Sequence, residues 1–199
     1  MRTIIRTRQH ITAALLVLFA LLVSMGATGQ QLKDFTLSNA ADGKSVALTD
    51  FKSSDGLVIV FMSTDCPFDS YYYNRIASLV TEYGNRVSLI LVNPNAGESA
   101  TAMKQTLGKM GISVPYLMDF DQVLMQNLGA TKTPEIFVLK NSGGLFTTIY
   151  HGAIDNNAQV ESEASESYGR NAIDAMLSGQ SPAQKEMRPA GCSIRKKDR

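Results

Sequence analysis

The stretch 57–70, LVIVFMSTDCPFDS, passes directly from an apolar run into a cysteine followed by a proline. The run 57–62 is continuous and of strand length, which is typical of a strand buried on both faces of a sheet. From Pro67 onward, apolar residues recur at steps of three and four until Gly84, which predicts a helix with one buried face. Cys66 therefore lies at the turn between a buried strand and a helix.

Outward from this stretch, strand and helix patterns alternate up to residue 139, which requires right-handed crossovers and a parallel core. The turn 141–144 then joins two strands as an antiparallel hairpin, and a final helix follows. This order predicts an α/β, thioredoxin-like fold: a central mixed β-sheet flanked by helices, with extra N-terminal strands. The further expected strands are 34–37, 45–48, 87–92, 115–118, 135–139 and 145–151, and the further helices are 99–110, 122–128 and 168–177.

The N-terminal residues have the three-part pattern of a secretory signal peptide. Three arginines precede the apolar run 11–23, and small residues follow at 27–29. We expect residues 1–29 to be removed, the mature chain to begin at or near Gln30, and the protein to be exported, either periplasmic or secreted. After cleavage no membrane contact is expected, whereas an uncleaved chain is membrane-anchored.

The C-terminal residues have a different composition from the rest of the mature chain. From residue 180 on, the chain contains Pro182 and Pro189, few apolar residues and a basic end. A segment with so few apolar residues does not pack tightly by itself. We expect a thioredoxin-like domain over 30–180 and an extended C-terminal tail over 181–199.

The overall composition gives no support to nucleic-acid binding or to a metal site. Of the 199 residues, 44% are hydrophobic and 19% charged, and the net charge of +1 gives no reason to expect a nucleic-acid partner. After the signal peptide the chain has one histidine, His151, and two cysteines far apart in sequence. This set does not favour zinc or copper, and we expect neither a metal nor a cofactor.

Cys66 stands where the cap of the predicted helix belongs, with Pro67 at the first helical position. The unpaired amides of the first turn stabilise a thiolate, which is the form that attacks a disulfide or a peroxide. Asp65 and Asp69 are expected to oppose this effect, because nearby negative charge disfavours a second anion. The alternative is that Cys66 is a small buried core residue.

Four segments resemble the redoxin branch of the thioredoxin superfamily, which includes the alkyl hydroperoxide reductase/thiol-specific antioxidant (peroxiredoxin-like) proteins. They are FTLSNAADGKSVALTDF (35–51), VIVFMSTDCPF (58–68), GATKTPEIFVL (129–139) and, in the tail, GCSIR (191–195). The resemblance implies a thiol oxidoreductase and a substrate-binding shell around Cys66. By this resemblance the shell contains Ser63, Thr64, Pro67, Thr133 and Pro134.

The chain also departs from the patterns of these relatives. Asp69 occupies the place of the second cysteine in the Cys-x-x-Cys motif of thioredoxins. Ser63 and Ile59 stand where peroxiredoxins have a threonine and a proline, and the peroxiredoxin arginine before a late strand is missing. Thr133-Pro134 instead resembles the threonine and cis-proline that face the active cysteine of thioredoxins, where a substrate chain pairs with the backbone. Alternatively, this proline simply begins an edge strand.

Two functions remain open from the sequence. In the first, Cys66 attacks a protein disulfide or a small peroxide, Cys192 resolves the product, and an external thiol supplies electrons. In the second, the protein is a catalytically silent thioredoxin-like binding module, and a Cys66–Cys192 disulfide is a structural staple.

Overall fold

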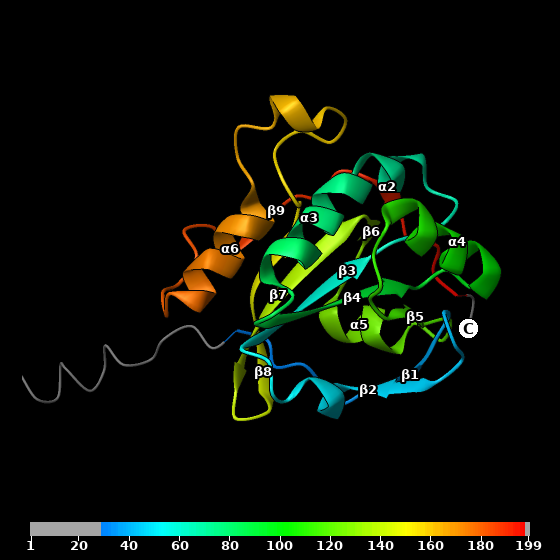
Figure 1. Ribbon diagram of the computed structural model, residues 1–199, viewed down its shortest axis with the longest axis horizontal. Coiled ribbons are helices and arrows are strands. Elements are labelled where there is room, and N and C mark those ends of the chain that lie inside the picture. Colours follow the sequence, from blue (N-terminus) through cyan, green and yellow to red (C-terminus); the bar gives the residue numbers. More distant parts are fainter. Residues whose placement is uncertain (1–28, 198–199) are drawn as a thin grey trace, which may run out of the picture.

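A mixed eight-stranded β-sheet with helices on both faces forms the body of the protein (Figure 1). The computed structural model describes residues 29–197, so the cleavage and export predicted from residues 1–28 lie outside the described residues. Within 29–197, no helix has the length and apolar character needed to cross a membrane. The strands of this sheet are β1 (Thr36–Asn39), β2 (Ser45–Ala47), β3 (Gly56–Phe61), β4 (Val87–Asn93), β5 (Tyr116–Met118), β7 (Glu135–Ser142), β8 (Leu145–Gly152) and β9 (Glu186–Met187).

The topology of the sheet confirms the predicted thioredoxin-like fold. Strands β3, β4 and β5 are parallel neighbours, β7 is antiparallel to β3, and β8 is antiparallel to β7. The order across the sheet is β2-β1-β5-β4-β3-β7-β8-β9, so the two N-terminal strands extend the edge beyond β5. The helices are α2 (Pro67–Tyr71), α3 (Tyr73–Tyr83), α4 (Ala100–Met110), α5 (Val123–Leu128) and α6 (Tyr168–Leu177), with short 3₁₀ turns η1 (Leu48–Phe51) and η2 (Glu161–Glu163).

Strand β3 is the centre of the core because its side chains alternate between two buried layers. Val58 and Val60 pack in the layer that contains buried residues of α3, α4 and α6. Ile59 and Phe61 pack in the other layer, with residues of η1 and α5. All four side chains are at most 1% exposed, and full burial of a side chain of this size contributes about 1.5–3 kcal/mol. The buried run seen in the sequence thus fixes the strand that leads to Cys66.

The helix expected from Pro67 to Gly84 is divided into α2 and α3. The break is at Tyr72, whose φ and ψ are −100° and −1° and whose amide donates to the carbonyls of Asp69 and Ser70. The Tyr72 ring is buried, and the Arg75 guanidinium lies 4.3 Å from its centre. The break separates the short turn that carries Cys66 from the longer helix that covers the sheet.

The tail packs on the domain through two short strands that the sequence did not predict. Strand β9 runs parallel to the end of β8, with Glu186 opposite His151. Strand β10 (Cys192–Ser193) pairs antiparallel with β6 (Lys132–Thr133) in a separate two-stranded sheet. The tail has few apolar residues to bury, and backbone hydrogen bonds to the domain attach it instead. The expectation that the tail does not pack tightly is therefore wrong around these strands.

Candidate functional site

The site is built around Cys66 at the end of β3. Cys66 is the cap residue of α2, with backbone angles of −88° and 119°, and Pro67 is the first residue of the helix. The sequence predicted this local arrangement. The amide of Asp69 donates to the Cys66 carbonyl at 3.2 Å, which closes the first turn. The cysteine is 7% exposed, so its sulfur is not freely open to solvent.

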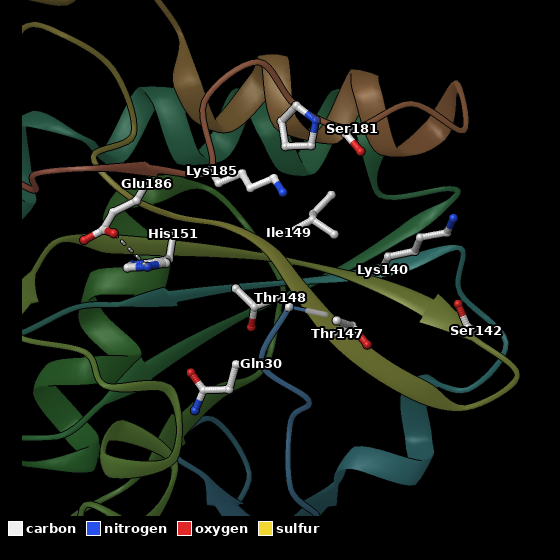
Figure 2. Close-up of a pocket in the computed structure, with 12 residues that line it drawn as sticks. Gln30, Lys140, Ser142, Thr147, Thr148, Ile149, His151, Ser181, Lys185 and Glu186 are labelled. Carbon is white, nitrogen blue, oxygen red and sulfur yellow. Dashed lines mark ion pairs between the residues drawn. The ribbon is translucent and has the colours of Figure 1, made fainter. Parts of the chain in front are cut away.

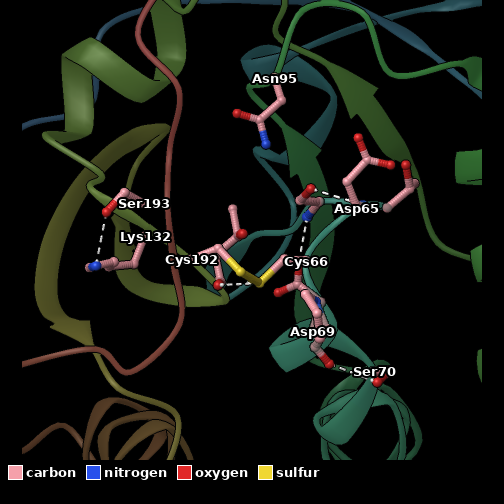
Figure 3. The surroundings of a disulfide bond; sticks show 12 residues. Asp65, Cys66, Asp69, Ser70, Asn95, Lys132, Cys192 and Ser193 are labelled. Carbon is pink, nitrogen blue, oxygen red and sulfur yellow. Dashed lines mark hydrogen bonds between the residues drawn. A yellow bond between two sulfur atoms is a disulfide. The ribbon is translucent and has the colours of Figure 1, made fainter.

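Cys66 is joined to Cys192 by a disulfide (Figure 3). The two Cα atoms are 5.9 Å apart, within the usual range for this bond, although the residues are 126 positions apart in sequence. Cys192 belongs to β10 and is half-buried. The tail therefore brings the second sulfur to the helix cap.

Thr133 and Pro134 face the disulfide from the other side. The Thr133–Pro134 peptide bond is cis, as the resemblance implied. The Cys66 sulfur lies 3.4 Å from the carbonyl oxygen of Thr133, and Thr133 pairs with Cys192 in the short sheet. The Cys66 sulfur and the Cys192 backbone thus both lie against the backbone just before Pro134.

The loop between β3 and Cys66 is held by a buried carboxylate, Glu98. Its Oε1 accepts a hydrogen bond from the Ser63 hydroxyl at 2.6 Å, and its Oε2 accepts from the amide and hydroxyl of Thr64 at 2.5 and 2.6 Å. Amide groups of Asn93 and Asn95 donate to it at 2.7 and 3.1 Å. Burial raises the pKa of Glu98, but these hydrogen bonds outweigh burial and lower it, so Glu98 is charged.

This network changes the role expected of Ser63. By the resemblance, Ser63 stands at the position of the peroxiredoxin threonine and belongs to the substrate-binding shell around Cys66. In the structure, the Ser63 hydroxyl donates to Glu98 and accepts a hydrogen bond from the Asp65 amide at 3.1 Å. A hydroxyl has a single proton to donate. Ser63 and Thr64 therefore shape the loop, and they do not point donors at the sulfur.

Asp69 occupies the second-cysteine position and is fully buried. Its Oδ2 accepts a hydrogen bond from the Ser63 amide at 2.6 Å, whereas its Oδ1 has no hydrogen-bond partner among residues 29–197. Burial raises the pKa of Asp69 to about 8, against the lowering effect of hydrogen bonds from Ser63 and Thr133. Asp69 is therefore largely protonated at pH 7. The expectation that its charge opposes a Cys66 thiolate is wrong.

Asp65, the other carboxylate beside Cys66, is exposed and paired with the tail. The Arg195 guanidinium lies 3.4 Å from its Oδ2. The Arg195 amide donates to the Asn95 side chain at 3.1 Å, and the Gln122 amide group donates to the Arg195 carbonyl at 2.6 Å. These contacts hold the residues after Cys192 against the loops that follow β4 and β5.

Glu98, Asn93 and Asn95 were not predicted from the sequence as parts of the site. One feature of the sequence points to them: polar residues follow the buried strand 87–92, and the carboxyl ends of parallel neighbours meet at the same edge of a sheet. β4 is the parallel neighbour of β3, which leads to Cys66. Glu98 itself has no local pattern that indicates burial, because its partners Ser63 and Thr64 are distant in sequence.

A cavity of about 490 Å³ lies between β8 and the segment that follows α6 (Figure 2). Neither cysteine lines it. At its wall, His151 is 3.8 Å from Glu186 of the tail and 3.9 Å from the buried Glu135, and its ring is stacked on Phe137. The neighbouring Glu135 carboxylate raises the pKa of His151. His151 thus supports β7 and the tail, and the described residues contain no group of three or more side chains suited to hold a metal.

Solved structures give the fold of the chain independent support. An uncharacterized conserved protein from Geobacillus kaustophilus is 28% identical, with a TM-score of 0.76, over 87% of this chain and 94% of that chain. A hypothetical protein from Sinorhizobium meliloti 1021 is 26% identical, with a TM-score of 0.74, over 86% and 95%. A secreted Mycobacterium tuberculosis disulfide oxidoreductase homologous to E. coli DsbE is 14% identical, with a TM-score of 0.52, over 73% and 95%; this similarity concerns the fold alone.

Comparison with curated proteins finds no match. Among protein families, the Redoxin pattern matches residues 27–165. The matched range contains β1 through β8 and the cap cysteine Cys66, while Cys192 lies beyond it. The fold and the Cys66–Cys192 disulfide fit a thiol oxidoreductase. The chain belongs to the Redoxin family, within the thioredoxin superfamily.

Proposed function

We propose that this protein is an exported thiol–disulfide oxidoreductase in which Cys66 is the nucleophile and Cys192 the resolving thiol. One observation carries the proposal: the cysteine at the helix cap is bonded to a tail cysteine at the Thr133 backbone. A disulfide with a purely structural role does not need to lie at a helix cap beside the Thr133 backbone. The proposal includes cleavage of residues 1–29, so that the mature chain begins at Gln30. The mature chain then consists of a domain over 30–180 and a tail over 181–199.

The reaction has two exchange steps. In the reduced protein, the Cys66 thiolate attacks one sulfur of a substrate disulfide, forms a mixed disulfide with it, and releases the other substrate sulfur as a thiolate. The Cys192 thiolate then attacks the Cys66 sulfur and releases the first substrate sulfur. The substrate gains two electrons and leaves as a dithiol after protonation, and the protein is oxidised to the Cys66–Cys192 disulfide.

The environment of Cys66 supports the first step. Cys66 is the cap residue of α2, and the N-terminal end of a helix favours a thiolate over a thiol. Because Asp69 is largely protonated at pH 7, it adds little negative charge against that thiolate.

The two cysteines differ in exposure, which determines the cysteine that an external thiol attacks when the disulfide is reduced again. Cys66 is 7% exposed, whereas Cys192 is half-buried. A donor thiolate therefore attacks Cys192, and Cys66 leaves as the thiolate that the helix cap stabilises. A sulfur with a low pKa is the better leaving group, so exposure and leaving ability favour the same direction.

Alkylation of single-cysteine variants tests the proposal. In Cys192→Ser, Cys66 is expected to react with iodoacetamide at neutral pH faster than Cys192 does in Cys66→Ser. Non-reducing peptide mapping of the wild type is expected to show the Cys66–Cys192 linkage, opened by millimolar dithiothreitol. A Cys66 that stays unreactive until denaturation would support the silent, stapled module instead.

Peroxide is tested in the same preparation. Reduced wild type is expected to form the disulfide faster with a peptide disulfide than with an equal concentration of hydrogen peroxide, because Ser63 is committed to Glu98. The reverse order of rates would assign the protein a peroxidase activity. N-terminal sequencing of exported material tests the start at Gln30, and a membrane-held chain that begins at Met1 would contradict it.

A further inference from the structure

Strand β6 has one strand partner among the described residues, and that partner is the tail of the same chain. Cys192 pairs with Thr133 and Ser193 with Lys132, and the Ile194 amide continues the ladder by donating to the Thr131 carbonyl at 3.0 Å. This edge lies outside the main sheet and directly beside the Cys66 sulfur. It is an edge that accepts an extended chain through backbone hydrogen bonds.

The surroundings of residues 191–194 restrict which side chain fits at each position. A Cβ atom on Gly191 would lie 2.1 Å from the Thr133 carbonyl oxygen and 3.1 Å from the ring of Pro134, so a larger residue does not fit there. Ile194 is 8% exposed and packs in the core layer beneath β3, while Ser193 between them is exposed. The strand therefore presents a small residue, a cysteine, an outward residue and a buried aliphatic residue.

The tail also has the character of a detachable strand. It is two residues long in the ladder, and the side chain that follows, Arg195, is exposed and paired with an exposed Asp65. Exposed ion pairs contribute at most about 1 kcal/mol. The covalent bond to Cys66 and the burial of Ile194 are the strongest links at this edge.

We propose that residues 191–194 act as a built-in copy of the substrate strand. The partner is then an extended polypeptide that carries a cysteine in a small–Cys–x–aliphatic pattern, and it binds β6 in the place of the tail. This inference rests on the proposed function and adds its substrate class and its regulation. In the oxidised protein the disulfide locks the tail on the edge. Reduction leaves the tail held by non-covalent contacts alone, so a partner strand then competes with it for β6.

The sulfur chemistry remains balanced in this scheme. The partner's cysteine sulfur, held opposite Thr133, belongs to a disulfide that the Cys66 thiolate attacks, and the other sulfur of that disulfide leaves as a thiolate. When Cys192 attacks the mixed disulfide, its strand returns to β6 and displaces the partner strand, which leaves as a thiolate. Resolution of the disulfide and release of the partner are then one event.

The test uses the hexapeptide AGCSIR, which copies residues 190–195, with its cysteine activated as a mixed disulfide with thionitrobenzoate. The matched peptide AVCSIR carries valine in the place of Gly191. Both are mixed with three reduced full-chain variants: Cys192→Ser, and this change combined with Gly191→Val or with Ile194→Ser to displace the tail. The rate of thionitrobenzoate release is measured, with dithiobisnitrobenzoate as a small disulfide for comparison.

In both double variants, AGCSIR is expected to react at least about ten-fold faster than AVCSIR, the equivalent of about 1.4 kcal/mol. AGCSIR is also expected to react faster with the double variants than with Cys192→Ser, in which the tail still covers β6. Equal rates for the two peptides, with normal reaction of the small disulfide, would overturn this inference alone. A Cys66 that reacts with none of the three reagents would overturn the proposed function as well.

Discussion

Two segments far apart in the sequence hold the two sulfur atoms, and they do so by different means. The loop before Cys66 is fixed by Glu98, which accepts five hydrogen bonds inside the protein. The segment that carries Cys192 is fixed at an edge, by a two-residue ladder with β6, by the buried Ile194 and by two backbone hydrogen bonds of Arg195. A buried charge with a full set of donors does not move without a large loss, whereas a short edge strand opens locally at low cost.

The difference suits a pair of cysteines with unequal tasks. Cys66 needs a fixed environment, because the stability of its thiolate depends on the positions of nearby amides and carboxyls. Cys192 needs to leave and return, since it resolves whatever Cys66 has bound. The predictions below test whether the rigid side and the detachable side behave as differently as their contacts indicate.

The largest effect is expected from the disulfide that joins the two sides. It closes a loop between residues 126 apart, and the chain-entropy account gives about 5 kcal/mol for a loop of this length. Reduced wild type is expected to lose up to that amount of unfolding free energy relative to the oxidised protein, measured by urea titration. Cys192→Ala, which has no disulfide, serves as the control and is expected to be insensitive to dithiothreitol. A loss under about 1 kcal/mol would contradict the prediction.

The next effect isolates the rigid side. Glu98→Ala leaves the donors of Ser63, Thr64 and Asn93 without their acceptor, and each buried polar group left unsatisfied costs about 1–3 kcal/mol. Urea titration of the oxidised variant measures this loss. Glu161→Ala removes an exposed carboxylate and is expected to change the unfolding free energy by less than about 0.5 kcal/mol. Equal effects of the two substitutions would mean that the Glu98 network does not fix the loop.

The next effect, at most about 1.4 kcal/mol for each pH unit, concerns the pH dependence of stability through Asp69. Its pKa of about 8 in the folded protein exceeds the ordinary value of 3.8, so between these pH values the folded state binds more protons than the unfolded state. The unfolding free energy therefore falls as pH rises through this window, by at most about 1.4 kcal/mol per pH unit, and levels off above about pH 8.

Asp69→Asn is expected to remove this fall. The pKa of His151 is also raised, so His151 stabilises the fold at low pH and loses this contribution as pH rises through its folded value. The difference between wild type and variant, measured from pH 5 to pH 8, cancels the His151 contribution. Parallel pH curves for the two proteins would refute the assignment of a protonated Asp69.

The smallest effect is expected on the detachable side. Arg195→Ala removes the exposed pair with Asp65, and the oxidised protein is expected to lose at most about 1 kcal/mol of unfolding free energy. Ile194→Ala, its matched neighbour, removes a buried side chain and is expected to cost more, about 2 kcal/mol. If Arg195 proves the more important of the two, the tail is held by charge and the comparison needs revision.

The sheet was predictable from the sequence because its strands leave a pattern along the chain. Strand β3 is a continuous apolar run, and α3 repeats its buried positions every three or four residues. Strands β6, β9 and β10 have two residues each, too few for any period. They exist because backbone groups distant in sequence meet in the folded chain, which no local window of sequence reports.

The candidate site was predictable in its residue types and less so in its charges. The motif order identified Cys66, Thr133 and Pro134, and the structure brings them together with Cys192. The protonation of Asp69 was not foreseen, because it depends on burial. Asp69 is buried beside Ser63 and Thr133, and the sequence pattern of α2 gives no indication of this burial.

The separation of the two cysteines along the chain also sets an order of events during synthesis. A ribosome delivers the chain from its N-terminus, and domains form as their residues emerge. Cys66 and every strand from β1 to β9 precede Cys192 in the chain. The disulfide therefore closes only after all strands of the main sheet have been synthesised. A chain cut anywhere between these cysteines carries a Cys66 with no intrachain partner. Closure of this bond therefore distinguishes a finished molecule from a fragment.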